Sequence, residues 1–194
     1  MAALTEPPYL RKGNIMKTAL EIQDVESLKL RFPYMFAGSP ISLEFYRGWF
    51  PCFIKLCFVI DELLGDERHR FSWVRLTEKF GGYRMSFSFQ LPPSAADGGD
   101  ETDRTLTDDY QHSEEREVLM ELRDQIRSAV KRCAVLLDTL CCVCGGPGSK
   151  RTGGWIRTLC EFHTEDAILA RGDDRHVLEL AVVPKWPGDI RGAR

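Results

Sequence analysis

Four cysteine and histidine positions near the end of the sequence have the spacing of metal ligands. Cys141 and Cys144 form a C-x-x-C pair, and fifteen residues further on Cys160 and His163 form a C-x-x-H pair. Two such pairs at this separation are typical of Zn²⁺ sites. Four protein ligands would complete a tetrahedron and leave no position for a reactive water. The sequence therefore predicts a structural Zn²⁺, whose binding energy is folding energy.

A third cysteine leaves one ligand open to an alternative. Cys142 could replace Cys141, but it would form a C-x-C pair with Cys144. This spacing is tighter and less common than C-x-x-C among metal ligands. We therefore prefer Cys141 and treat Cys142 as the alternative ligand. The chain has seven cysteines in all, an odd number that excludes a fully paired disulfide framework in a monomer. The three outside this block lie in apolar patterns, where free cysteine packs as a small hydrophobe: Cys52, Cys57 and Cys133.

The two ligand pairs need a turn, a returning strand and a helix to bring them together. Gly145 and Gly146 allow backbone amides to fold over the first two thiolates. Residues 153–159 predict the returning strand, and a helix is expected over 162–170. This order predicts a treble-clef-like zinc knuckle.

The rest of the chain predicts an α+β fold, in which helices pack on an antiparallel β-hairpin. Apolar residues recur at helical spacing in two stretches, 48–64 and 115–139, and are sparser in a third that is expected to form a short helix. Alternation on both sides of Gly81-Gly82 predicts the hairpin. One strand is expected to carry Phe71, Trp73, Arg75 and Thr77 on one face, and the other Tyr83, Met85, Phe87 and Phe89. The expected helices are 18–31, 48–64 and 115–139, and the hairpin is 71–90.

A polar, acidic stretch separates the hairpin from the last of these helices. We expect residues 92–114 to form a solvated loop. The predicted domain division is 1–139 for the helices and hairpin and 140–194 for the zinc knuckle and a weakly specified tail. The candidate contacts for a basic partner are the acidic side chains Asp97, Asp100, Glu101, Asp103, Asp108 and Asp109.

A small basic and aromatic patch flanks the predicted metal ligands. Zinc modules with such patches can hold nucleic acid, so DNA or RNA binding is the alternative function. Its candidate residues are Lys150, Arg151, Trp155 and Arg157.

Composition and missing motifs exclude several function classes. With 26 basic and 29 acidic side chains the net charge is −3, which excludes a polycation that coats nucleic acid by charge alone. No apolar run is long enough for a membrane span, and no export signal is evident, so we expect a cytoplasmic protein. The sequence contains no G-x-S-x-G, P-loop or H-E-x-x-H motif, and we expect no enzymatic activity.

Three sequence blocks resemble a family of small uncharacterised bacterial proteins. They are R-G-W-F at 47–50, an E-K-F-G-G-x-R block at 78–84, and the C-x-x-C-G-x-P-G and G-W-x-x-T-L-C-x-x-H segments of the zinc knuckle. The similarity covers roughly residues 43–170, except the stretch 92–114. The resemblance implies an accessory or immunity-type role. Together with the acidic segment it predicts a non-catalytic immunity protein that binds and neutralises a cognate toxin, for example a nuclease with a basic cleft.

Overall fold

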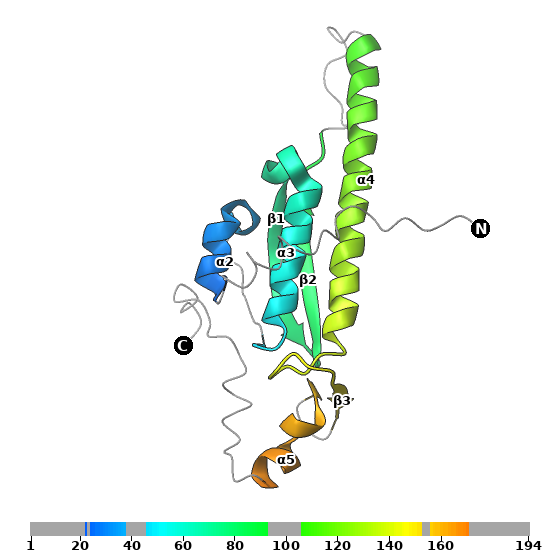
Figure 1. The fold of residues 1–194 in the computed structure, drawn as a ribbon. Helices are drawn as coiled ribbons and strands as arrows, with labels where there is room; N and C mark the ends of the chain where they lie inside the picture. Colours follow the sequence, from blue (N-terminus) through cyan, green and yellow to red (C-terminus); the bar gives the residue numbers. More distant parts are fainter. Residues whose placement is uncertain (1–21, 23, 38–45, 93–105, 153–155, 171–194) are drawn as a thin grey trace, which may run out of the picture.

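Helices and one β-hairpin build the main body of the molecule (Figure 1). The computed structural model describes residues 22, 24–37, 46–92, 106–152 and 156–170. Strands β1 (Phe71–Lys79) and β2 (Gly82–Phe89) pair in antiparallel fashion, helix α3 (Phe50–Leu64) lies across them, and helix α4 (Leu106–Leu137) runs beside α3 and β2. The predicted mixture of helices with an antiparallel hairpin is confirmed.

Helix α2 (Val25–Arg31) is shorter than the helix expected over 18–31. Asp24 is extended, with φ −145° and ψ 171°, and its Oδ1 accepts a hydrogen bond of 2.7 Å from the backbone N–H of Ser27. This is an N-cap, so the helix begins at Val25 and one continuous helix over 18–31 is wrong; residues 18–21 lie outside the described part of the chain. A 3₁₀ turn, η2 (Pro33–Phe36), follows and packs beside β1.

Helix α3 ends at Leu64, as its sequence predicts, and begins at Phe50, two residues after the expected start. Pro51 lies in the first turn, where its missing N–H is not needed, and Gly65 ends the helix with a φ of 52°. Most of its apolar residues are buried, including Phe53, Cys57 and Ile60 with no exposed surface. The 3₁₀ turn η3 (Gly65–Arg70) leads from α3 into β1.

The hairpin turn consists of two residues with left-handed backbone. Lys79 pairs with Gly82, and between them Phe80 and Gly81 have φ values of 56° and 71°. Two consecutive positive φ angles are the pattern of a type I′ turn, whose twist matches that of the strands. The backbone N–H of Gly81 donates a hydrogen bond of 2.6 Å to Oε1 of Glu78.

A β-bulge changes which residues of β1 face the core. The register shifts between Trp73 and Arg75, so Val74 has no partner on β2. Trp73 and Leu76 are therefore both buried although they are three residues apart, while Arg75 is exposed. The expected strict alternation through Arg75 and Thr77 is wrong because one extra residue inverts the faces beyond it. On β2 the expected alternation is confirmed.

Helix α4 begins within the stretch that was expected to be a loop. Residues 106–114 are helical, and Asp108 and Asp109 lie in its first turns, where carboxylates favour a helix N-terminus. The expected loop over 92–114 is therefore wrong for these residues, and residues 93–105 lie outside the described part of the chain. The buried stripe of α4 includes Leu119 and Ile126, whereas Val118 is 66% exposed.

The core lies where α3, α4 and the hairpin meet. Phe53 of α3 contacts Trp73 of β1, with ring centroids 5.4 Å apart, and Phe71 stacks on Phe87 across the two strands at 5.3 Å. Cys52 and Cys133 meet where α3 contacts α4, with their sulfur atoms 3.6 Å apart. None of the described helices combines the length and apolar composition needed to cross a membrane.

Because of the bulge, we expect truncation of two nearby apolar residues of β1 to have different effects on stability. We expect Leu76→Ala to lower the free energy of unfolding by about 2–5 kcal/mol, because Leu76 is fully buried and a cavity would remain. Val74→Ala should change it by no more than about 0.5 kcal/mol, because Val74 is 58% exposed. Urea unfolding of both variants checks this, and an equal loss of stability would contradict the bulge.

Candidate metal centre

The first ligand pair lies on a tight knuckle directly after α4. The backbone N–H of Cys141 donates to the carbonyl oxygen of Gly146 at 2.7 Å, and the N–H of Gly145 donates to the carbonyl of Cys141 at 2.8 Å. Gly145 has a φ of 75°, which a residue with a side chain rarely adopts. These bonds close residues 141–146 into a loop that presents Cys141 and Cys144 to one point.

A short hairpin and a 3₁₀ turn deliver the second pair. Strand β3 (Ser149–Arg151) pairs with β4 (Arg157–Leu159), and Cys160 follows β4 directly. The turn η4 (Glu161–His163) then brings His163 back beside Cys160, with a backbone hydrogen bond of 3.1 Å between them. Residues three apart in a 3₁₀ turn lie on one side, so both side chains face the knuckle. Helix α5 (Glu165–Ala170) begins after Thr164, whose hydroxyl accepts a hydrogen bond from the N–H of Ala167.

The four predicted ligands converge. Sγ of Cys160 lies 3.2 Å from Nδ1 of His163, and the same nitrogen lies 3.6 Å from Sγ of Cys141. Sγ of Cys144 lies 3.9 Å from Sγ of Cys160, and all four donor atoms lie within 4.8 Å of one another. Ligands around a tetrahedral zinc-sized ion would be separated by about 3.5–3.8 Å, given metal–sulfur and metal–nitrogen distances of about 2.3 and 2.0 Å. Cys141, Cys144, Cys160 and His163 could therefore hold one metal ion.

The two adjacent cysteines have different surroundings. Burial alone would raise the pKa of the Cys141 thiol, but the backbone N–H groups of Cys144, Cys160 and Val143 bring it below its ordinary value. Burial, with the nearby charge of Cys141, raises the pKa of Cys142 to about 12. Burial and the neighbouring sulfur atoms of Cys141 and Cys160 raise the pKa of Cys144 as well. The positions of the donor atoms, and not the thiol pKa, therefore distinguish Cys141 from Cys142 as a candidate ligand. Cys142 lies outside the group of four.

The backbone of Cys142 instead joins the knuckle to the rest of the molecule. Its N–H donates to the carbonyl of Thr158 on β4, and its carbonyl accepts from the N–H of Gly48, both at 2.9 Å. The hydroxyl of Thr158, a fully buried residue, donates to the carbonyl of Asp138 just after α4. The knuckle is thus tied to β4, to the end of α4 and to the segment that leads into α3.

Gly48 and Trp49 dock the knuckle onto the start of α3. A Cβ atom on Gly48 would lie 2.2 Å from the carbonyl oxygen of Cys141 and 2.5 Å from the nitrogen of Gly145. Next to it, the indole N–H of the fully buried Trp49 donates to the carbonyl of Leu140 at 2.9 Å. Sequence reasoning did not connect these two residues with the metal ligands. Their only signal is the R-G-W-F block, which says nothing about what it contacts.

The structure brings only part of the predicted basic patch together. Arg151 and Arg157 pair directly across β3 and β4, and Lys150 and Arg151 are exposed. Arg157 is half-buried and interacts with the hydroxyl of Tyr46; burial, then the charge of Glu78, raises the pKa of that hydroxyl, and Arg157 opposes the rise. Trp155 lies outside the described residues.

The predicted acidic contacts lie away from the metal ligands in the chain. Asp108 and Asp109 are on the first part of α4, which extends beyond α3 and the hairpin (Figure 1). The other four acidic residues, Asp97, Asp100, Glu101 and Asp103, lie outside the described part of the chain.

Comparison with known proteins identifies no relative. No family model, no curated protein and no solved structure matches the chain. The family resemblance of its sequence blocks stays a prediction.

Replacing each of the adjacent cysteines separately tests the ligand assignment. We expect Cys141→Ser to lose the bound metal, because a closed set of four ligands would fall to three. Cys142→Ser should keep one ion per chain, since its sulfur is not among the four. Elemental analysis of both purified variants measures this; equal metal loss in the two would show that the assignment is wrong.

Replacing two glycines tests the contact between the knuckle and α3. Gly48→Ala should lower the free energy of unfolding by about 1–3 kcal/mol and weaken metal binding, because the added methyl group overlaps backbone atoms of the knuckle. Gly146→Ala is the matched control, since its methyl group would meet only Sγ of Cys144 at an ordinary 3.5 Å. Urea unfolding and competition with a metal chelator provide the two readouts. Equal effects of the two substitutions would contradict the role of Gly48.

Proposed function

We propose that the protein is a non-catalytic binding protein whose residues 140–163 are held in place by one structural Zn²⁺. The observation that carries this proposal is the convergence of three sulfur atoms and one imidazole nitrogen within 4.8 Å. Thiolate and imidazole ligands in a tetrahedral arrangement favour zinc over magnesium or calcium, which prefer oxygen ligands.

Complete ligation supports a structural role for the ion. Four protein ligands fill a tetrahedral coordination shell, so they leave no place for a water or a substrate. The knuckle also makes backbone hydrogen bonds to Gly48 and Thr158, and the carbonyl of the preceding Leu140 accepts a hydrogen bond from the indole of Trp49. These contacts hold the start of α3 and β4. The order of knuckle, hairpin β3–β4 and helix α5 supports a treble-clef-like arrangement of these residues.

We infer that the partner is a cognate toxin with a basic surface, and that the protein acts as its immunity protein. The first part of α4 supports this inference because it extends from the body of the molecule (Figure 1). Glu114 and Glu117, which follow on the same helix, are exposed. Asp108 and Asp109 lie one to three turns earlier on the same helix. Acidic groups on a projecting helix complement a basic nuclease cleft and speed association with it.

Co-purification with the product of the adjacent gene tests this function. We expect the pair to elute together, and Glu114→Lys/Glu117→Lys to weaken the complex at least tenfold because the substitutions reverse two exposed charges. Glu62→Lys/Asp66→Lys makes the same change in net charge at exposed positions near the end of α3 and is the control. Absence of a complex, or equal weakening by both double variants, would reject the proposed interface.

A further inference from the structure

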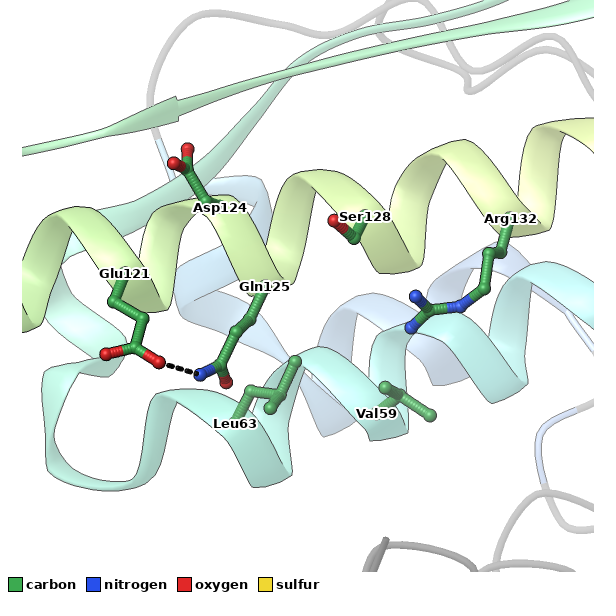
Figure 2. Close-up of a pocket in the computed structure, with 7 residues that line it drawn as sticks. All are labelled: Val59, Leu63, Glu121, Asp124, Gln125, Ser128 and Arg132. Carbon is green, nitrogen blue, oxygen red and sulfur yellow. Dashed lines mark hydrogen bonds between the residues drawn. The ribbon is translucent and has the colours of Figure 1, made fainter. Parts of the chain in front are cut away.

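Two grooves run along α4, one on each side, and they differ in charge. The groove between α3 and α4 encloses about 540 Å³ and is lined by acidic and basic side chains together with Val59 and Leu63 (Figure 2). Within it, the amide of Gln125 donates to Glu121 at 3.4 Å, and Arg132 extends toward α3. The mixed charges of this groove select no particular class of ligand.

The groove on the other side, between β2 and α4, is basic. It encloses about 570 Å³, and of the eleven described residues that line it four are cations and none is acidic. Arg123, Arg127 and Lys131 follow one another at intervals of four residues along α4, and Arg84 of β2 also lines the groove. Four residues of α-helix rise about 6 Å, so the three helical cations form a regular row along the groove.

Of the four cations that line this groove, two form no ion pair with a described residue and the other two share one carboxylate. Within the described part of the chain, Arg84 and Lys131 form no ion pair, and both are exposed. Asp124 is the carboxylate that touches the row: it lies 2.6 Å from Arg127 and 3.7 Å from Nε of Arg123. The second distance is too long for a hydrogen bond, and the buried Nε of Arg123 has no hydrogen-bond partner among the described residues.

Apolar side chains lie between the cations. Phe87 and Phe89 of β2 are half-buried and line the groove opposite Val130 of α4. Cations at regular intervals suit a polymer that carries one negative charge per unit. Half-buried phenyl rings suit flat bases that are not enclosed in a duplex.

We propose that the groove between β2 and α4 binds single-stranded nucleic acid. The phosphates follow Arg123, Arg127 and Lys131 with Arg84 on the opposite wall, and the bases contact Phe87 and Phe89. This site shares no residue with the candidate metal centre or with the acidic residues Glu114 and Glu117 of α4. It also differs from the patch of Lys150 and Arg151 beside the metal ligands.

Fluorescence anisotropy of a labelled oligothymidylate of about ten nucleotides, mixed with the full metal-loaded chain, tests the proposal. We expect binding that weakens about 20-fold between roughly 50 and 200 mM salt, because neutralising about three phosphates of a single strand gives a logarithmic slope near −2. Arg84→Glu/Lys131→Glu should weaken binding at least tenfold. Absence of binding at low salt, or tighter binding to a duplex of the same length, would overturn the proposal.

Adjacent residues of α4 supply the matched control. Arg132→Glu makes the same charge change as Lys131→Glu one position away, but Arg132 lines the other groove (Figure 2). Arg84, Lys131 and Arg132 are all exposed, so circular dichroism of the variants should show an unchanged fold. If Lys131→Glu and Arg132→Glu weaken binding equally, only net charge matters and the groove is not the site.

Two further measurements distinguish nucleic-acid binding in this groove from binding at β3 and from binding of an acidic protein segment. Lys150→Ala/Arg151→Ala should leave oligothymidylate binding within about twofold of the unsubstituted chain; a larger loss would move the site to β3. Oligoglutamate should not displace the oligonucleotide at equal charge concentration. Displacement would assign the groove to an acidic protein segment and overturn the nucleic-acid proposal.

Discussion

The close approach of Gly48 to the knuckle is the contact on which the arrangement of this protein depends. At this point two backbone segments, separated by more than ninety residues of sequence, meet with no room for a side chain. The hydrogen bonds of Gly48 and Trp49 to residues 142 and 140 extend that contact. Trp49 is itself fully buried beside Tyr46 and Tyr83, so the knuckle continues directly into the aromatic core. Free energy from a metal ion held by the four candidate ligands would therefore be shared with the packing of α3 on the hairpin.

Helix α4 connects the regions to which we assign different roles. Its last residues lead into the knuckle, its middle part packs against α3 and β2, and its first part extends away from both (Figure 1). One face of its middle part carries the row of cations, whereas acidic residues are exposed nearer its start. A single long helix can thus separate a candidate metal centre, a basic groove and an acidic projection, because successive turns place side chains at fixed distances and directions.

Several elements show where the spacing of apolar residues was sufficient to predict secondary structure and where it failed. Helix α3 was predicted well because three local signals all indicate the same helix: its apolar spacing, Pro51 in the first turn and Gly65 at its end. In β1 the alternation failed beyond Val74, because a bulge arises from the pairing of two strands and is not visible in either strand alone. The start of α4 was missed because acidic and polar residues are typical of loops and of helix N-termini alike.

By itself, the sequence was sufficient to predict which four residues converge as candidate metal ligands, because the spacing in C-x-x-C and C-x-x-H is a local property and short turns can present both pairs to one point. It was also sufficient for the hairpin and for the centres of the main helices. The C-x-x-C spacing favoured Cys141 over Cys142, and the tertiary structure decided between them because it leaves Cys142 outside the group of four. The tertiary structure alone placed Gly48 against the knuckle and Arg84 in the same groove as Lys131, because contacts between distant segments depend on how whole elements pack.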